Sequence, residues 1–310
     1  MEIRFSSPAD GAPTITFVNV AVIDVGSYTV RLLVCRSDQG ALEPIREARA
    51  ALALGAEIER DGSISAPKLA ETTRQVRSYV RAARKLGVEA IEVIVTAPGR
   101  QGANADELVA GLRSATGAPV RILSPVEEGQ FAFAGAVSSS DVGAETVAVC
   151  DVGGGSTEIV VGTRAEGPAW MRSFDIGALR LTNRFPNEDP PSAASLEAAS
   201  AEVAEGLTGF TPPLPRTALA TGGTARALRK LVGGTLGPEE FAAALAIVMR
   251  RPAARVAKTF GIDRDRALTL PAGVLILRAV QERLRVPIDV ARSGLREGAA
   301  LALLEEEAAA

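Results

Sequence analysis

Two aspartates of this sequence stand near the ends of two almost identical segments. Val20–Gly26 reads VAVIDVG and Val147–Gly153 reads VAVCDVG, so six of the seven residues match. The apolar residues of each segment predict a buried β-strand, and the glycine after Asp24 or Asp151 predicts a tight turn. Successive backbone N–H groups in such a turn form a concave site for an anion. An aspartate is compatible with a bound phosphate where Mg²⁺ lies between them, because Mg²⁺ binds one or two carboxylates together with phosphate oxygens.

The repeated pattern therefore predicts a cleft between two facing turns that holds phosphate groups and a divalent cation. The first turn continues into Ser27, and the second begins the run GGGST over residues 153–157. A dinucleotide site is disfavoured, because Gly-x-Gly-x-x-Gly is absent at both turns and that motif places its acidic residue about 20 residues downstream. Two ordinary strand–turn units of an α/β fold are the remaining alternative, and they explain a single copy better than a matched pair.

The composition restricts the chemistry available at such a cleft. The chain has 310 residues, a net charge of −3 and no histidine. Without histidine, a Ser-His-Asp triad and a histidine general base are excluded. Any acid–base catalysis must therefore use carboxylates, Lys, Tyr or Cys. Cys35 and Cys150 lie in apolar runs, which is typical of buried thiols. The weak net charge disfavours binding of a nucleic acid polymer, so an anionic ligand requires a local site.

Nothing in the sequence predicts a contact with a membrane. The longest uncharged stretch, residues 11–23, has 13 residues and is too short for a transmembrane helix. The N-terminus also lacks the basic region and apolar run of a signal peptide. We therefore expect a cytoplasmic protein.

Strands alternate with helices along the chain, which predicts an α/β fold. Strands are predicted over residues 14–23, 30–35, 91–95, 120–123, 146–151, 158–162, 169–174, 217–221 and 288–292, with 45–55 as an ambiguous further strand. Helices are predicted to begin near residues 67, 104, 125, 176, 193, 225, 238, 267 and 295, and residues 96–99 are predicted to form a loop.

The internal repeat implies two similar halves, each with a mixed sheet. The polar stretch 138–141 is the best candidate for a boundary between them. We therefore predict one domain over residues 1–137 and a second over residues 138–310. The C-terminal helix over 295–310 is a candidate to join the first domain.

In its motifs the chain resembles the exopolyphosphatase / guanosine pentaphosphate phosphohydrolase (Ppx/GppA) family, in the short two-domain form. Five segments carry the resemblance in order: 23–32 (IDVGSYTVRL), 151–158 (DVGGGSTE), 173–182 (SFDIGALRLT), 221–225 (TGGTA) and 294–298 (GLREG). This family belongs to the actin-like ATPase superfamily. The resemblance implies two ribonuclease-H/actin-like domains, with mixed sheets flanked by helices and a cleft between the domains.

The resemblance also implies roles for individual residues. Residues 124–129 (SPVEEG) resemble the family's Ser-Gly-x-Glu-Glu-Ala, which makes Glu128 the implied general base, and Arg100 matches the family arginine that grips phosphate. Ligation of Mg²⁺ or another divalent cation is implied for Asp24, Asp151 and Glu158. Phosphate binding is implied for Gly26, Ser27, Arg31, Gly153, Gly154, Gly155, Ser156, Thr157, Gly222 and Gly223.

The implied reaction is hydrolysis of the terminal phosphoanhydride of inorganic polyphosphate, with release of orthophosphate. Three alternatives stay open: a guanosine pentaphosphate 5′-phosphohydrolase, a nucleotide-dependent kinase or ATPase of the same superfamily, and a non-catalytic binder of polyphosphate or guanosine polyphosphates. The last is motivated by departures from the family pattern, because Tyr28, Gln101 and Pro125 replace an asparagine, an acid and a glycine. The resemblance also suggests a homodimer.

Overall fold

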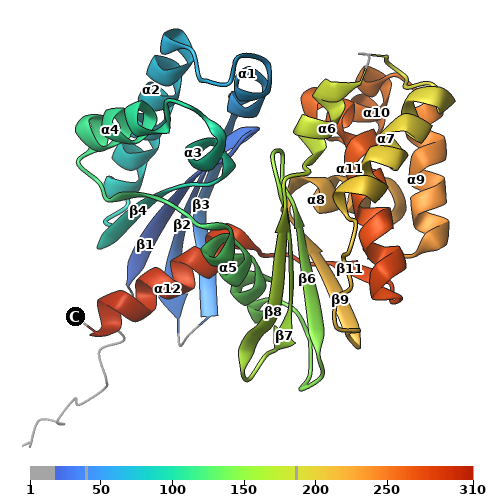
Figure 1. Ribbon diagram of the computed structural model, residues 1–310. Helices are drawn as coiled ribbons and strands as arrows, with labels where there is room; N and C mark the ends of the chain where they lie inside the picture. The colour runs from blue at the N-terminus through green and yellow to red at the C-terminus, as the bar shows by residue number, and fades with distance from the viewer. Residues whose placement is uncertain (1–17, 39–40, 186–187, 310) are drawn as a thin grey trace, which may run out of the picture.

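The chain folds as two α/β halves, each built on one mixed β-sheet (Figure 1). The computed structural model describes residues 18–38, 41–185 and 188–309. Helices flank both sheets, and two helices lie between them in the middle of the molecule (Figure 1). The prediction of two mixed sheets flanked by helices is confirmed.

The first sheet has the strand order β3-β2-β1-β4-β5. Its strands are β1 (Asn19–Val25), β2 (Thr29–Asp38), β3 (Ala41–Ala51), β4 (Ala90–Val95) and β5 (Val120–Ile122). β1 lies in the centre, antiparallel to β2 and parallel to β4. Successive side chains of a strand point to opposite faces. Ala21 and Ile23 pack towards α2 (Ala66–Arg84) and α4 (Ala105–Thr116), whereas Val20 and Val22 pack with α12 (Leu295–Ala309).

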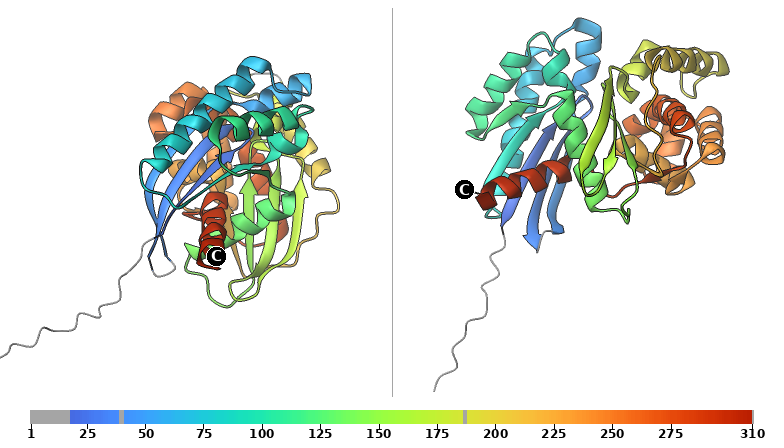
Figure 2. Two further views of the ribbon diagram at one scale, coloured as in Figure 1. Left: turned by 90° about the vertical axis from the view of Figure 1, so that its left-hand side faces the viewer. Right: turned by 60° about the horizontal axis from the view of Figure 1, so that its bottom comes forward.

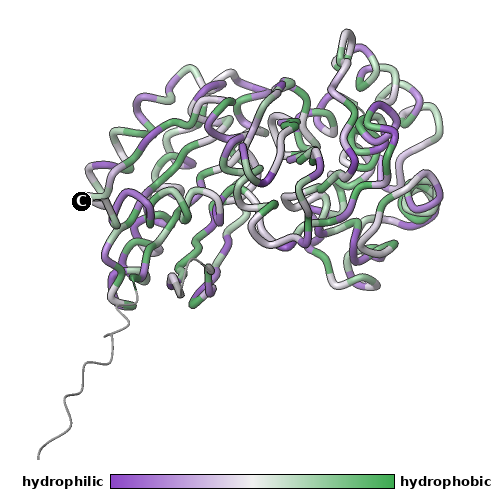
Figure 3. The backbone as a smooth tube through the Cα atoms, turned by 90° about the horizontal axis from the view of Figure 1, so that it is seen from below, coloured by the Kyte–Doolittle hydropathy of each residue, from purple (hydrophilic) through white to green (hydrophobic). Residues whose placement is uncertain are grey.

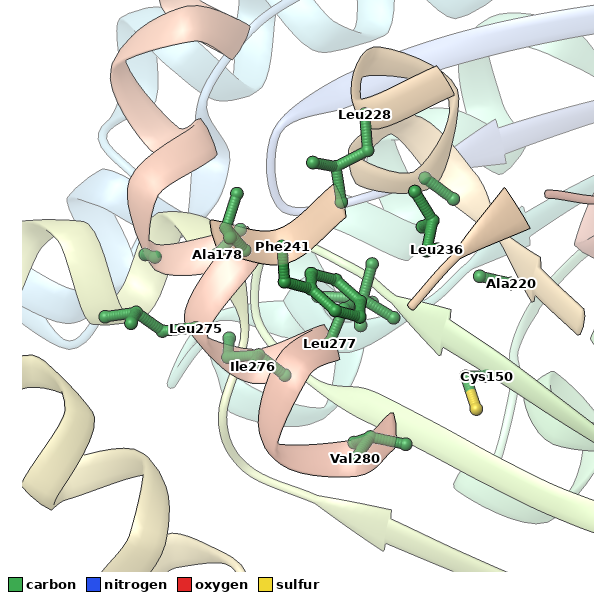
Figure 4. Packing of buried hydrophobic residues seen from close by; sticks show 14 of the residues in the cluster. Cys150, Ala178, Ala220, Leu228, Leu236, Phe241, Leu275, Ile276, Leu277 and Val280 are labelled. Carbon is green, nitrogen blue, oxygen red and sulfur yellow. The ribbon is translucent and has the colours of Figure 1, made fainter. Parts of the chain in front are cut away.

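The second sheet has the strand order β10-β11-β9-β6-β7-β8. Its strands are β6 (Val147–Val152), β7 (Thr157–Thr163), β8 (Gly167–Phe174), β9 (Thr217–Thr221), β10 (Thr235–Leu236) and β11 (Ile288–Val290). The helices of this half are α6 (Ala178–Arg184), α7 (Ala193–Gly206), α8 (Gly222–Val232), α9 (Pro238–Arg250), α10 (Ala253–Phe260) and α11 (Arg264–Leu284). These helices share a large core with the sheet, where Phe241 lies beside Leu277 and near the strand residues Cys150 and Ala220 (Figure 4).

Two helices exchange partners between the halves. α5 (Pro125–Ser138) packs on the second sheet, whereas α12, which follows that sheet in sequence, packs on the first (Figure 2). α5 and α12 also cross each other in close contact. A Cβ on Gly135 would collide with the backbone of Gly294, and a Cβ on Gly298 would collide with the carbonyl of Phe131. Glycine is therefore required on both helices at this crossing.

Most predicted elements form within a few residues of their predicted ends. β1 begins at Asn19, and the part of its predicted range before residue 18 lies outside the described residues. The ambiguous strand over 45–55 forms as β3, but it ends at Ala51 and helix α1 (Leu54–Asp61) follows it. The loop predicted over 96–99 was wrong, because helix α3 (Ala97–Gln101) forms there, and α1, β10 and α10 were not predicted. α1 and α3 both lie beside the tip of β1, so tertiary contacts override the local sequence signal there.

Hydrophobic and hydrophilic residues alternate along most of the chain (Figure 3). Among the described residues, no helix is both long enough and apolar enough to cross a membrane. In the long helix α11, most side chains are buried in the core of the second half. Cys35 and Cys150 are buried free thiols, as predicted.

We expect Gly298→Ala to weaken the crossing of α5 and α12. The added methyl group would meet the Phe131 carbonyl, and such overpacking costs about 1–3 kcal/mol. Gly111→Ala on α4 is the matched control, because its Cβ would lie no closer than 3.4 Å to its nearest neighbour, Thr73. Denaturant unfolding measures both variants. Equal stabilities for the two would contradict the steric role of Gly298.

Candidate active site

The two repeated turns meet in one cleft of about 90 Å³ between the halves. From the predicted set, the cleft brings together Asp24, Gly26, Ser27, Arg31, Glu128, Asp151, Gly153, Gly154, Gly155, Ser156, Gly222 and Gly223. Arg100, Thr157 and Glu158 do not line it. The opposed turns and both aspartates therefore share a single opening.

The first turn is braced by the segment that leads into α1. The backbone N–H groups of Leu52 and Ala53 both donate to the carbonyl of Tyr28, at 3.1 and 3.0 Å, and Gly55 N–H donates to Ser27 O at 2.8 Å. Ala53 adopts a left-handed conformation with φ 52°, which is strained for a residue with a side chain. The Ser27 hydroxyl is buried and finds no partner among the described residues, so it remains available to a ligand.

The second turn is held by the start of α6. Ala178 N–H donates to Gly153 O at 2.9 Å, and the next two N–H groups donate to Gly154 O at 3.0 Å. Thr157 has a different place from the predicted one, because its buried hydroxyl donates to Ile176 O at 2.5 Å. It therefore anchors the loop before α6 and faces away from the cleft.

Burial dominates the electrostatics of the two aspartates. It raises the pKa of Asp24 to about 6, an effect that Arg31 and Arg296 oppose and Asp151 reinforces. Burial also raises the pKa of Asp151, while Arg226 and Arg31 lower it. Two adjacent buried carboxylates repel each other, and each becomes more favourable as an anion when a cation is bound between them.

The donor set fits a magnesium ion held by two carboxylates. Asp24 Oδ1 is buried and has no hydrogen-bond partner among the described residues, and Asp151 lies across the same opening. Mg²⁺ commonly takes one or two protein carboxylates and completes its shell with water and phosphate oxygens. Within the described chain, no three His, Cys, Asp or Glu side chains are grouped closely enough to hold a metal ion by themselves.

Glu158, the third predicted metal ligand, lies behind the cleft next to Glu128. Its Oε1 accepts a hydrogen bond from Ser173 Oγ at 2.8 Å, and its buried Oε2 finds no hydrogen-bond partner in the described part of the chain. Burial and then the nearby Glu128 raise the pKa of Glu158 well above its usual value. Glu158 is thus placed to influence Glu128, and the structure does not group it with the two aspartates.

Glu128 reaches the cleft from the first turn of α5. Ser124 caps this helix by accepting a hydrogen bond from Glu127 N–H, and Pro125 occupies the first helical position, where proline is well tolerated. Glu127 completes the capping box and pairs with Arg121 at 2.8 Å. The cap therefore uses Glu127, which leaves Glu128 free to point inward.

Arg100 contacts Glu128 instead of the cleft. Its Nη2 lies 2.8 Å from Glu128 Oε2, although the pair is not aligned as a hydrogen bond, and its Nη1 donates to Leu123 O at 2.8 Å. Burial raises the pKa of Glu128 to about 7; Arg100 opposes this shift, and Asp151 and Asp24 add to it. A carboxylate with a pKa near the working pH is well suited to act as a general base.

Three arginines that the sequence reasoning missed join Arg31 in the cleft. Arg226, Arg266 and Arg296 line it together with Arg31, and we call these four residues the arginine cluster. Burial, and then the like charges of Arg226 and Arg296, lower the pKa of Arg31 to about 9. Such a cluster favours an anion strongly, because guanidinium groups match phosphate oxygens in geometry and charge.

A sequence signal exists for two of the missed arginines. Arg226 follows the third glycine turn by three residues, and Arg296 lies inside the segment GLREG over 294–298. Arg266 has no such signal. It comes from the start of α11 and lies over the ring of Tyr28, with its guanidinium carbon 4.7 Å from the ring centre. Only the fold brings these three helices to one point.

The cleft continues into two neighbouring hollows. One, of about 350 Å³, shares Arg31, Arg226, Arg296 and Glu297 with the cleft and adds Arg49, Arg292 and Glu47. The other, of about 180 Å³, shares Arg31, Arg226 and Arg266 and adds Arg49, Lys230 and Asp263. Basic side chains therefore line a path from the cleft towards the surface.

Comparison with known proteins identifies the family. Residues 33–307 match the Ppx/GppA phosphatase family. The chain belongs to that family. It is 28% identical to exopolyphosphatase 1 of Mycobacterium leprae, over 94% of this chain and 91% of the relative, and 28% identical to exopolyphosphatase 1 of Mycobacterium tuberculosis, over 94% and 90%. The predictions of the family and of a phosphohydrolase are confirmed.

Solved structures agree with this assignment. The Ppx/GppA family member of Aquifex aeolicus has 26% sequence identity to this chain and a TM-score of 0.80, covering 94% of this chain and 99% of its own. An exopolyphosphatase from Cytophaga hutchinsonii has 19% identity and a TM-score of 0.85, covering 93% and 98%, and shows the same fold. The predicted actin-like ATPase fold is confirmed for this Ppx/GppA protein.

The raised pKa of Glu128 has a consequence for stability. An ordinary glutamate has a pKa of 4.5, so between this value and about 7 the folded protein holds a proton that the unfolded chain releases. This contribution to stability is complete below pH 4.5 and is lost as the pH rises through 7. Relative to Glu128→Gln, the wild type should gain up to about 3 kcal/mol of unfolding free energy between pH 8 and pH 5.

Denaturant unfolding of both proteins across this pH range, in the presence of EDTA, measures the difference. Parallel pH dependences in the wild type and Glu128→Gln would show that the carboxyl group of Glu128 titrates normally.

Proposed function

We propose that this Ppx/GppA protein releases terminal orthophosphate from inorganic polyphosphate, with Glu128 as the general base. The observation that carries the proposal is a buried carboxyl group with a pKa of about 7, facing a cleft formed by two glycine turns and the arginine cluster. The named exopolyphosphatase relatives support the choice of substrate.

In the proposed mechanism the substrate's terminal phosphate lies between the two turns. Backbone N–H groups of the turns and the hydroxyl of Ser27 donate to its oxygens, and the arginine cluster stabilises negative charge as it shifts towards the leaving phosphate. Glu128 orients the attacking water and accepts its proton. Phosphoryl transfer depends mainly on such positioning and charge stabilisation.

Mg²⁺ is the proposed cofactor, with Asp24 and Asp151 as its protein ligands. When bound, the ion supplies positive charge that neutralises phosphate oxygens. Arg100 has a proposed role that differs from the phosphate grip implied by the resemblance. Its ion pair with Glu128 and its hydrogen bond to Leu123 O hold the base in place, so we propose that Arg100 positions Glu128.

The shape and charge around the cleft favour a repeated phosphate chain over guanosine pentaphosphate. Among the described residues, the linings of both hollows are mainly charged and include no aromatic ring to stack on a base. The ring of Tyr28 is covered by Arg266. A Cβ on Gly223 would lie 2.7 Å from the guanidinium of Arg266, so the third glycine turn also faces the arginine cluster, where a kinase or ATPase would place adenosine.

The deciding experiment measures phosphate release in Mg²⁺ from polyphosphates of several lengths, from guanosine pentaphosphate and from ATP. Release from polyphosphate without a nucleotide supports the proposal. If phosphate is released from guanosine pentaphosphate alone, that compound is the substrate instead of polyphosphate. If titration calorimetry detects binding but no phosphate is released, the protein is a non-catalytic binder.

Glu128→Gln should lower kcat on polyphosphate at least about 100-fold, because a positioned base contributes 10²–10⁴-fold to such reactions. The KM should change little, since the amide keeps the size of the side chain. In the wild type, kcat/KM should fall as the pH drops below about 7, because protonated Glu128 cannot accept a proton. Unchanged turnover in the variant would remove Glu128 from this role.

Arg292→Gln tests whether a long polyphosphate chain extends from the cleft through the larger hollow. Arg292 is exposed and lines the larger hollow, so its loss should raise the KM for long polyphosphate about two- to fivefold at low salt and leave the shortest substrates unaffected. Arg46→Gln on β3 is the matched control, because Arg46 is exposed and lies outside both hollows. Equal effects of the two variants at all chain lengths would contradict a chain path through this hollow.

A further inference from the structure

The second glycine turn is held by contacts from both halves of the molecule. Within its own half, backbone N–H groups at the start of α6 bind the carbonyls of Gly153 and Gly154. The third glycine, Gly155, instead faces the first half: a Cβ there would lie 2.6 Å from Ser27 Oγ and 3.0 Å from Gln101 Oε1. The part of the turn closest to the substrate site is therefore fixed by contacts across the cleft.

Gln101 makes the polar contacts at this point. Its Nε2 donates to Asp175 Oδ1 at 3.0 Å and to Gly155 O at 3.4 Å. Gln101 is the last residue of α3 and follows Arg100, the ion-pair partner of Glu128. One amide group thus connects the helix that holds the base to the turn that faces it from the other half.

A charged pair supports the same junction. Arg180 of α6 lies 2.8 Å from Glu59 of α1 and 3.3 Å from Asp175. Arg184, one turn further along α6, lies 3.1 Å from Glu59. α1 and α6 approach each other at this end of the cleft (Figure 1). The carboxylate of Asp175 is 82% exposed, so its ion pair with Arg180 contributes little, and the bridge from Glu59 to Arg180 provides the stronger link between the halves.

The chemistry of the junction requires a donor at residue 101. Both partners of Gln101, a carboxylate and a backbone carbonyl, are acceptors, so the side chain at residue 101 has to present N–H groups to them. An ionised acid at this position would direct lone pairs at two acceptors and add a second negative charge beside Asp175. The neutral amide therefore matches the local geometry.

We infer that Gln101 is a positioning residue that fixes the second glycine turn against the helix of Arg100, across the cleft. The inference rests on the proposed hydrolysis for its kinetic consequence, because a displaced turn misplaces the terminal phosphate relative to Glu128. Its structural consequence, a more mobile turn at residues 153–155, is independent of any reaction.

Gln101→Glu is the first test. It should lower kcat on polyphosphate about 10-fold with a smaller change in KM, which is the size expected when two contacting groups become repulsive. In the double variant Gln101→Glu, Asp175→Asn, residue 101 carries the carboxylate and residue 175 the amide, so the pair is again complementary. This variant should recover part of the lost kcat. Gln130→Glu is the control. Gln130 is exposed on α5, so this substitution adds the same negative charge without facing Asp175.

Hydrogen exchange of the peptide over residues 151–157 gives a readout that needs no turnover. Exchange should increase in Gln101→Glu, return towards the wild-type rate in the combined variant and stay unchanged in Gln130→Glu. Unaltered exchange in Gln101→Glu, or a combined variant no better than Gln101→Glu alone, would overturn the inference. A wild-type protein that releases no phosphate would instead refute the proposed function, and the exchange data would still decide the role of Gln101.

Discussion

The site depends on one constraint, the burial of carboxylates and guanidinium groups together in one cleft, where Asp24 Oδ1 and Glu128 Oε2 have no hydrogen-bond partner among the described residues. Burial raises the pKa of Asp24, Asp151 and Glu128 and lowers the pKa of Arg31, Arg226 and Arg266. Buried charges of this kind cost stability unless they are paired. A cation bound between the aspartates would neutralise the carboxylates, and phosphate groups bound among the arginines would neutralise the guanidinium groups. The free energy of binding then offsets the cost of burying these charges.

The fold keeps these charges in place because the reactive ends belong to central strands. β1 and β6 each pair on both sides, so the aspartates near their ends have little freedom to move. The turns after them are then tied by backbone hydrogen bonds, from the left-handed Ala53 segment in the first half and from α6 in the second. A preorganised set of donors needs no rearrangement as charge develops during the reaction.

The sequence was sufficient for the architecture and for the parts of the site that lie in the repeat. The strands with their Asp-x-Gly turns follow from local patterns, Glu128 at the start of α5 was implied by the family resemblance, and the structure brings them to one cleft. Residues whose place depends on packing between helices were predicted less well. Arg266 comes from a helix with no motif, and the hydroxyl of Thr157 donates a hydrogen bond to Ile176 O. Arg100 pairs with Glu128, because helix α3 forms where a loop was expected. Periodicity cannot show which side chains meet across two halves.

The exchange of α5 and α12 has a consequence for how the polypeptide is made. The face of the first sheet that carries Val20 and Val22 is covered by a helix formed from the last residues of the chain. During synthesis on a ribosome this face stays uncovered until α12 has been made, although its strands emerge first. The N-terminal half therefore gains the cover of this face only after the second half has been made, when α12 packs against α5 at their paired glycines.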